Sequence, residues 1–190
     1  MSSLRFTVSL LLQILSIILV STSVYSSIVD DLNNRRNTDY PKWIESNGPI
    51  VDTAAVNIGD FDRNQPIICR IAIAEALIPG SVNATSGLCQ ATWKGQVVTS
   101  MSTEYLSGPI KRLVWAESNR GNIPTGAVIG GVTSDGVKIY IIRIRKDANS
   151  KDFLGGKIIK GDKQGSVIKE GKEFTTPTYE VLCLQTIIFP

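Results

Sequence analysis

The stretch WAESNRGNIPTGAVIGG at residues 115–131 decides the fold, because the chain contains a second, diverged copy of it. That copy, WIESNGPIVDTAAVNIG at residues 43–59, aligns with residues 115–131 without a gap. Each copy opens on a tryptophan, with Glu, Ser and Asn two, three and four positions later. Internal similarity of this kind is the mark of a fold built from repeated units. The sequence therefore predicts one structural unit that occurs twice.

The similarity continues downstream and sets the predicted boundaries. ICRIAI at residues 68–73 aligns with IIRIRK at residues 141–146, and TEYL at residues 103–106 aligns with YEVL at residues 179–182. The offset grows between these blocks, as expected where insertions fall in loops. The predicted parts are a signal peptide (1–26), an N-terminal segment (27–42), a first, degenerate repeat (43–106), a linker strand (107–114) and a second repeat with its closing strand (115–190).

Both units are predicted to be β-structure. Isoleucine and arginine alternate in KIYIIRIRK at residues 138–146, the period-two pattern of a strand with one buried face. Asp135-Gly136 lies between two strand-like runs and indicates a hairpin, because both central residues of the favoured two-residue turn need a positive φ. Equivalent turns are predicted at Lys94-Gly95 and at Glu170-Gly171. The sequence thus predicts an all-β fold of two pseudo-symmetric repeats that share strands, with a buried closing strand and little helix after the signal peptide.

The first 26 residues have the pattern of a secretory signal peptide. Arg5 precedes an apolar run at residues 6–20, and small polar residues follow before the predicted cleavage after Ser23 or Ser26. A membrane anchor is the competing interpretation, but the run is shorter than the roughly 20 apolar residues that a spanning helix needs. We therefore expect the mature chain to be secreted and extracellular, without insertion in a membrane.

Composition argues against several classes of function. The chain has 20 basic and 17 acidic residues, and removal of the leader takes away one basic residue, so no nucleic-acid partner is indicated. The absence of histidine removes Ser-His-Asp and Cys-His catalysis and the commonest zinc ligand. We expect no metal, no cofactor and no enzymatic activity. A carboxylate-based hydrolase leaves no distinctive trace in a sequence and stays open as a remote alternative.

Three cysteines allow at most one intramolecular disulfide. The expected secretory compartment lets disulfides persist. Cys69 and Cys89 are favoured as the pair because they lie close along the chain, with Cys183 left over. The alternative is that all three are small, buried apolar residues.

The second unit resembles a known family. WAESNRGNIPTGAVIGG, followed by IYIIRI, GGKI and YEVL, is similar to the DM-nine repeat family, the natterin-like lectin module. The resemblance covers both units and is weaker in the first. It implies an all-β fold of two units that share strands, and binding of mannose-type glycans without metal or catalysis, in innate recognition of microbes.

The resemblance also implies the site residues of the second unit. In the family, sugar contacts involve the lysine of a PGK motif and an acidic residue shortly after a GG pair. The lysine falls on Lys157 in GGKI, where Gly155 replaces the proline of the family. The acidic position falls near Thr133, with Asp135 the closest carboxylate. An ammonium that donates and a carboxylate that accepts would complement the hydroxyl groups of a sugar.

In the first unit the corresponding positions have changed. The acidic position falls between Asp60 and Asp62, and the lysine has become Ser81. We therefore expect one intact carbohydrate site around Lys157 and a weakened or absent one around Ser81. Shallow sugar sites gain affinity through multivalency, which two repeats or a homodimer would supply.

Structural interpretations compete with these assignments. The Asp-Gly context already explains Asp135 as a turn residue, and Lys157 can be a solvated loop lysine. The recurrence of Arg70 and Arg143 favours structural ion pairs. Trp43 and Trp115, which open the two units, are expected to be core anchors. The alternative is that these rings are exposed and stack on a sugar face.

Two further motifs bear on metal binding and glycosylation. Asp60, Asp62 and Asn64 have the spacing of a calcium loop, but Gln65 stands where glycine is needed, so a metal is not expected. Asn83-Ala84-Thr85 is a glycosylation sequon two residues from Ser81. A glycan on Asn83 would cover the degenerate site of the first unit, and mass spectrometry of the secreted protein checks that hypothesis.

The sequence thus favours a secreted, mannose-type lectin that recognises microbial or host glycans. One alternative is a structural or interaction protein that kept the fold and lost sugar binding, which the change of lysine to Ser81 favours. Another alternative is a secreted effector or toxin component. Natterin-like toxins join this module to a pore-forming domain, for which few residues remain.

Overall fold

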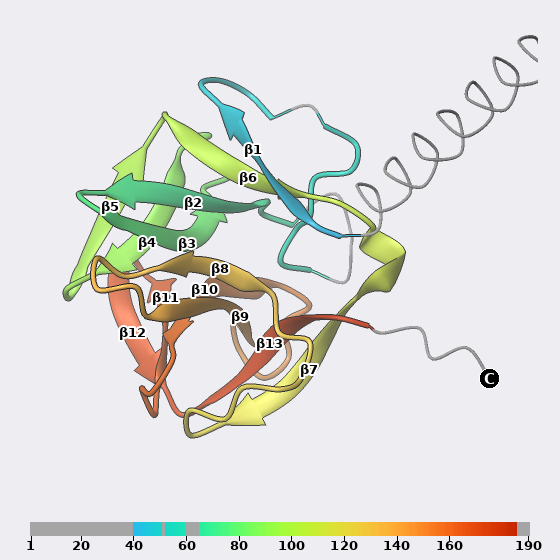
Figure 1. The fold of residues 1–190 in the computed structure, drawn as a ribbon, viewed down its shortest axis with the longest axis vertical. Helices are drawn as coiled ribbons and strands as arrows, with labels where there is room; N and C mark the ends of the chain where they lie inside the picture. The colour runs from blue at the N-terminus through green and yellow to red at the C-terminus, as the bar shows by residue number, and fades with distance from the viewer. Residues whose placement is uncertain (1–39, 51, 60–64, 186–190) are drawn as a thin grey trace, which may run out of the picture. The chain divides into compact units, whose positions relative to one another are not determined.

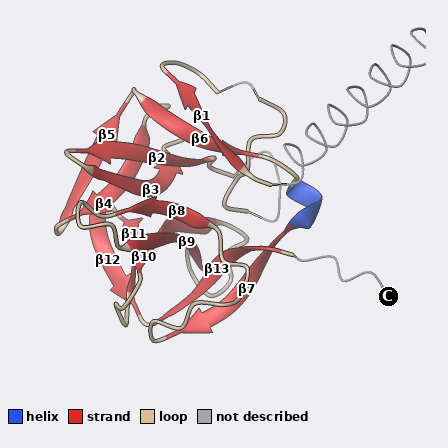
Figure 2. Ribbon diagram, viewed as in Figure 1, coloured by secondary structure: helices blue, strands red, loops and turns tan. Residues whose placement is uncertain are grey.

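A computed structural model describes residues 40–50, 52–59 and 65–185. The predicted signal peptide and the candidate residues Asp60 and Asp62 lie outside this part of the chain. The described residues form thirteen strands in one antiparallel sheet and one 3-10 turn, η1 (Ile110–Arg112). Figure 2 shows the strands in red and this turn in blue. The prediction of an all-β fold is therefore confirmed. Within these ranges, no helix has the length and apolar character needed to cross a membrane.

Two sets of six strands have the same order of pairing (Figure 1). The first set contains β1 (Lys42–Ser46), β2 (Ile68–Ile73), β3 (Ala76–Val82), β4 (Cys89–Trp93), β5 (Gln96–Ser100) and β6 (Thr103–Ser107). The second set contains β7 (Leu113–Asn119), β9 (Lys138–Arg145), β10 (Phe153–Ile159), β11 (Gly165–Lys169), β12 (Lys172–Thr176) and β13 (Thr178–Leu184). Strand for strand, β1-β6-β2-β3-β4-β5 corresponds to β7-β13-β9-β10-β11-β12.

The two sets are joined in the sheet through β8 (Ile129–Val132), which pairs with β9 and, at Leu77 and Val132, with β3. The closing strand β13 pairs with β7 and β9, both strands of its own set. Only Pro177 separates β13 from β12, which keeps the closing strand in its own unit. The segment expected as a linker strand, residues 107–114, contains the 3-10 turn between the end of β6 and the start of β7.

A tryptophan, an arginine and a glutamate meet in each unit and account for the repeated motif. In the first unit Arg70 lies 4.3 Å from the ring centroid of Trp43. Its Nε and Nη2 donate to the two carboxylate oxygens of Glu104 over 2.7 and 2.9 Å. An arginine over an aromatic face and a bidentate carboxylate pair are both favourable contacts. The motif WxES therefore lies in a strand whose tryptophan covers an ion pair between the adjacent strand β6 and the next strand, β2.

The second unit repeats this arrangement with deeper burial. Arg143 lies 4.6 Å from the ring centroid of Trp115, and its Nε donates to Glu180 over 2.5 Å. Arg143 also lies 3.7 Å from the ring centroid of Phe153 and donates to the carbonyl oxygen of Ile58 in the first unit over 3.1 Å. The expected structural ion pairs of both arginines are thus present, and the tryptophans pack against the core.

Two details of the predicted strands were wrong. The strand β9 is buried on both faces over most of its length, because Arg143, only 4% exposed, is held by Glu180 and by aromatic rings and does not face solvent. The hairpin at Asp135-Gly136 exists, but only Gly136 has a positive φ, of 81°. The amide of Gly136 donates to the carbonyl of Thr133, so this turn is a longer loop closed by a glycine rather than a two-residue turn.

The expected two-residue turns do occur at the equivalent hairpins. Lys94 and Gly95 have φ values of 51° and 80°, and Glu170 and Gly171 have φ values of 52° and 74°. Positive φ at both central residues matches the right-handed twist of the flanking strands. These two hairpin ends carry residues into the pockets described below.

A disulfide joins Cys69 on β2 to Cys89 on β4, whereas Cys183 is a buried free thiol. The second unit has no disulfide between the corresponding strands, β9 and β11, and packs two side-by-side residues there instead. Its residues at the corresponding positions are Ile142 and Gly165, as the matching registers of the two units show. A Cβ on Gly165 would lie 2.3 Å from the Cδ1 of Ile142, so the isoleucine occupies the space above the glycine.

Candidate functional site

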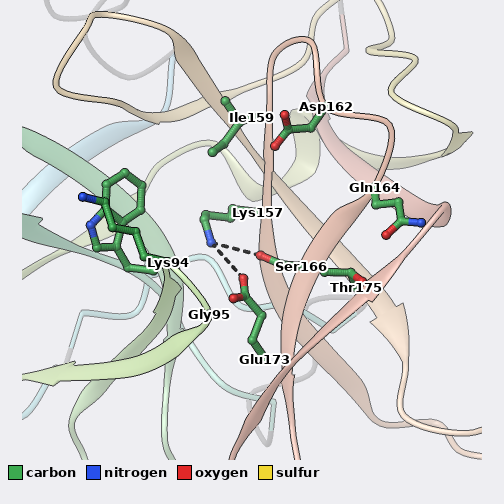
Figure 3. Close-up of a pocket in the computed structure, with 10 residues that line it drawn as sticks. Lys94, Gly95, Lys157, Ile159, Asp162, Gln164, Ser166, Glu173 and Thr175 are labelled. Atoms are coloured by element: carbon green, nitrogen blue, oxygen red, sulfur yellow. Dashed lines mark hydrogen bonds and ion pairs between the residues drawn. The ribbon is translucent and has the colours of Figure 1, made fainter.

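The candidate site is a pocket of about 310 Å³ around Lys157, shown in Figure 3 and called the Lys157 pocket below. The second unit supplies most of its lining: Lys157, Ile159, Asp162, Gln164, Ser166, Glu173 and Thr175. The first unit supplies the end of the β4–β5 hairpin: Trp93, Lys94 and Gly95. The pocket is therefore built by both units.

Strand register explains why these side chains share a face. Lys157 on β10 lies opposite Ser166 on β11, and Ser166 lies opposite Thr175 on β12. Side chains alternate between the two faces of a strand, so Glu173 faces the same way as Thr175. Directly paired residues of antiparallel strands lie about 5 Å apart. The floor of the pocket is thus set by three neighbouring strands, and Asp162 and Gln164 come from the β10–β11 loop.

Lys157 is buried, at 5% exposure, and its ammonium is fully occupied by the protein. Its Nζ donates to the carbonyl oxygen of Thr92, to the hydroxyl of Thr92 over 2.6 Å and to the hydroxyl of Ser166 over 2.9 Å. A lysine ammonium has three N–H donors, so these three bonds use all of them. Thr92 belongs to β4, so Lys157 ties the floor of the pocket to the first unit.

A carboxylate balances the charge of this lysine. The Nζ of Lys157 lies 3.6 Å from the Oε1 of Glu173, as an ion pair rather than a hydrogen bond. Burial lowers the pKa of Lys157 from its usual 10.5, and the negative charges of Glu173 and Asp162 offset part of that effect. Glu173 is itself 17% exposed at the wall of the pocket, where it can still reach a ligand.

Replacing Lys157 by methionine tests this burial through the pH dependence of stability. Because the folded-state pKa of the lysine is lowered, the unfolded state binds more protons between that pKa and 10.5, and the free energy of unfolding rises with pH in this window. We expect the wild type to gain stability relative to Lys157→Met as pH increases toward 10.5, by at most about 1.4 kcal/mol per pH unit. Urea unfolding of both proteins between neutral pH and that value measures the difference, and a difference that stays flat contradicts the lowered pKa.

The rim of the Lys157 pocket has the groups that a polyhydroxylated ligand needs. Asp162 and Gln164 are exposed, and Trp93 is half-buried with its ring at the pocket wall. The Nζ of Lys94 lies 5.8 Å from the ring centroid of Trp93. Carboxylates accept hydrogen bonds, an amide both donates and accepts, and an indole ring offers an apolar face.

The structure separates the residues that the resemblance suggested. Lys157 lines the pocket, but Asp135 lies in the exposed β8–β9 loop, where it accepts a hydrogen bond from the hydroxyl of Thr133, and it is not part of the pocket lining. This hydrogen bond lowers the pKa of Asp135. The carboxylates that accompany Lys157 are instead Glu173 and Asp162. Asn83 lies at a second pocket, around Ser81, that is taken up below.

Of the residues that line the Lys157 pocket, sequence reasoning assigned only Lys157 to the site, and it missed Trp93, Asp162, Gln164 and Glu173. The alignment of the Lys94-Gly95 and Glu170-Gly171 turns was the only signal, because it shows that both units have the same hairpin. It could not show that the hairpin of one unit reaches the lysine of the other. That contact joins residues more than 60 positions apart, Lys157 and Thr92 among them.

The family model described as DM9 repeat matches residues 60–151, which is the family that the sequence pattern resembles. The match includes the Trp93 hairpin and runs across both units, and Lys157 lies beyond its end. No curated protein matches the chain at a significant level.

Proposed function

Since residues 60–151 belong to the DM9 repeat family, which is associated with carbohydrate-binding, lectin-like proteins, we propose that this protein is a secreted lectin that binds mannose-type glycans in the Lys157 pocket. The observation that carries the proposal is the pairing of two carboxylates, Glu173 and Asp162, with the ring of Trp93 around one small pocket. No catalytic step is proposed for this site.

The chemistry of the pocket suits a pyranose ring. The carboxylates of Asp162 and Glu173 accept hydrogen bonds from neighbouring hydroxyl groups, and Gln164 can donate to a ring or hydroxyl oxygen. The face of a hexose that presents C–H groups packs on the indole of Trp93. A pocket of about 310 Å³ has room for one sugar unit and is at the small end of ligand sites.

Lys157 acts in this proposal as a positioning residue. Its three donors bind Thr92 and Ser166, so it holds the carboxylate of Glu173 by charge and fixes the β4–β5 hairpin against β10. The sugar is contacted by the rim. This role differs from the direct contact that the resemblance implies for the lysine.

Substitution of Asp162 by asparagine tests the site. Asp162 is exposed, so the change should leave the fold intact, whereas the loss of a charged acceptor should weaken binding of methyl α-mannoside by about tenfold, equivalent to about 1.4 kcal/mol. Binding is measured by NMR titration of the purified protein, with and without a chelator, after a glycan array has shown which sugars bind.

Two matched substitutions interpret the result. Asp147 is exposed in the β9–β10 loop and does not line the pocket, so Asp147→Asn should bind as the wild type does. Asp135→Asn should also bind normally. Normal binding by Asp162→Asn together with weak binding by Asp135→Asn would move the site to the β8–β9 loop, as the resemblance implies.

The second candidate function is a structural or interaction protein without sugar binding. The occupied donors of Lys157 favour it, because no proton of that ammonium is left for a ligand. A blank glycan array in both the presence and the absence of calcium supports this candidate. The lectin proposal also includes secretion, recognition of microbial or host glycans, and formation of a homodimer. Detection of the protein in the medium of expressing cells checks secretion, the glycan array checks recognition, and the mass in solution checks the dimer.

A further inference from the structure

A second pocket of about 320 Å³ lies around Ser81 and is called the Ser81 pocket below. Its polar lining consists of Ser81, Asn83, Gln90 and Glu170, and its apolar wall includes Leu154 and Ile168. Ser81 on β3 lies opposite Gln90 on β4, just as Lys157 lies opposite Ser166 in the other unit. The Ser81 pocket is thus the counterpart of the Lys157 pocket, and its volume is nearly the same.

The chemistry of the two pockets differs at each corresponding position. Ser81 stands in place of Lys157, Gln90 in place of Ser166, and the hairpin end Glu170-Gly171 in place of Lys94-Gly95. Among the residues that the structure describes, no lysine or arginine lines the Ser81 pocket. A pocket with two amides, a hydroxyl and one carboxylate at its edge has therefore replaced one that is organised around a buried cation.

The amides of the Ser81 pocket are held in a fixed arrangement. The Nδ2 of Asn83 donates to the Oε1 of Gln90 over 3.0 Å, and the Oδ1 of Asn83 accepts from the backbone amides of Thr85 and Ser86 over 2.9 and 3.0 Å. Among the described residues, neither the Nε2 of Gln90 nor the Oγ of Ser81 has a hydrogen-bond partner. The Nε2 of Gln90 and the hydroxyl of Ser81 are thus left for a ligand, whereas the Oε1 of Gln90 already accepts a hydrogen bond from Asn83.

We propose that the Ser81 pocket binds an N-acetylhexosamine. The acetamide group of such a sugar has a carbonyl that accepts from the Nε2 of Gln90 and an N–H that donates to the hydroxyl of Ser81. Its methyl group packs against the half-buried side chains of Leu154 and Ile168. Glu170, exposed at the hairpin end, accepts from a ring hydroxyl. A hexose without the acetamide leaves these amide and apolar contacts unmade.

The acetamido sugar can come from two sources, because the sequon Asn83-Ala84-Thr85 begins in the pocket. One source is the first sugar of a glycan attached to Asn83 of the same chain. The other is an N-acetylhexosamine of an external glycan. The Nδ2 of a glycosylated asparagine keeps one N–H, so the bond from Asn83 to Gln90 can survive attachment.

The binding test uses protein from a host that does not glycosylate, with methyl N-acetylglucosaminide and methyl glucoside as probes. We expect the acetamido sugar to shift the NMR signals of the Asn83 and Gln90 side-chain amides and to bind at least about tenfold more tightly than the glucoside. Gln90→Leu should abolish that preference, whereas Gln96→Leu, the same change at an exposed glutamine that lines neither pocket, should preserve it. Equal affinity for the two probes, or an unchanged preference in a folded Gln90→Leu variant, overturns the proposal.

The source is identified with protein from a glycosylating host. If the ligand is the glycan of the chain itself, Asn83 is modified, its first acetamide methyl shows nuclear Overhauser contacts to Leu154 and Ile168, and the added probe no longer shifts Gln90. If the ligand is external, Asn83 is unmodified and the probe binds as it does to the non-glycosylated protein. A modified Asn83 whose acetamide does not contact the pocket, combined with a pocket that does not bind the probe in the non-glycosylated protein, overturns the proposal for both sources.

Discussion

Gly156→Ala is expected to lower the free energy of unfolding by more than about 3 kcal/mol, or to prevent folding altogether. A Cβ on Gly156 would lie 2.0 Å from the carbonyl oxygen of Ser166 on β11, and 2.8 Å from the Cγ1 of Val167. The obstacle is backbone, which a rotamer change cannot relieve, so β10 and β11 would have to separate. Urea unfolding followed by tryptophan fluorescence measures the effect.

Other glycines provide controls for this expectation. Gly80 occupies the matching place in the first unit, where a Cβ would lie 1.9 Å from the carbonyl oxygen of Gln90, so Gly80→Ala should be about as damaging. Gly48 has no atom within 4 Å of its added Cβ, and Gly48→Ala should change stability by less than about 1 kcal/mol. A Gly156→Ala protein that unfolds at the same urea concentration as Gly48→Ala would show that the sheet can open there at little cost.

Loss of the Cys69–Cys89 disulfide is expected to cost about 3 kcal/mol. The bond closes a loop with a sequence separation of 20 residues, and in the chain-entropy account it restricts the unfolded chain. Both sulfurs are also buried in the core of the first unit, with Ile71, Ile78 and Ala91 in the same cluster. The double variant Cys69→Ala, Cys89→Ala should therefore unfold at a clearly lower urea concentration than the wild type.

Cys183→Ala serves as the reference, because that thiol is buried but forms no disulfide. In the Cys183→Ala background, a reducing agent should destabilise the protein, but by less than the double substitution does, because the double substitution also removes the packing of two buried sulfur atoms. Insensitivity of this background to reduction would mean that the bond contributes nothing beyond the packing of its sulfur atoms. Thiol labelling of the denatured wild type should find one free thiol before reduction and three after it.

Much of the fold could be predicted because its signals are local. The repeated WxESN motif predicted two equivalent units, and the WxES part of each motif lies in a strand, β1 or β7, that pairs with the last strand of its unit. Alternation in residues 138–146 predicted β9, and the Lys94-Gly95 and Glu170-Gly171 turns have the predicted positive φ values. These features depend on residues close to one another in the chain, and a sequence shows them directly.

The details that depend on distant residues could not be predicted. Arg143 had the position of a solvent-facing residue in an alternating strand, and its burial requires Glu180, Trp115 and Phe153 from other strands. The Asp135-Gly136 sequence predicted a turn, but the type of that turn depends on how many residues separate β8 from β9. Lys157 was found through a family motif. The three oxygen atoms that accept its hydrogen bonds belong to Thr92 on β4 and Ser166 on β11, and neither residue lies in a recognisable motif.

Because both units contribute to both pockets, one unit alone could not form either ligand site. Each pocket is lined by residues of both units, and each receives a hairpin end from the other unit, Lys94-Gly95 for the Lys157 pocket and Glu170-Gly171 for the Ser81 pocket. A single unit expressed alone would have only part of each pocket, and two units side by side are needed to complete them. Duplication within one chain then allows the two pockets to diverge separately in ligand preference, a freedom that two identical subunits do not have.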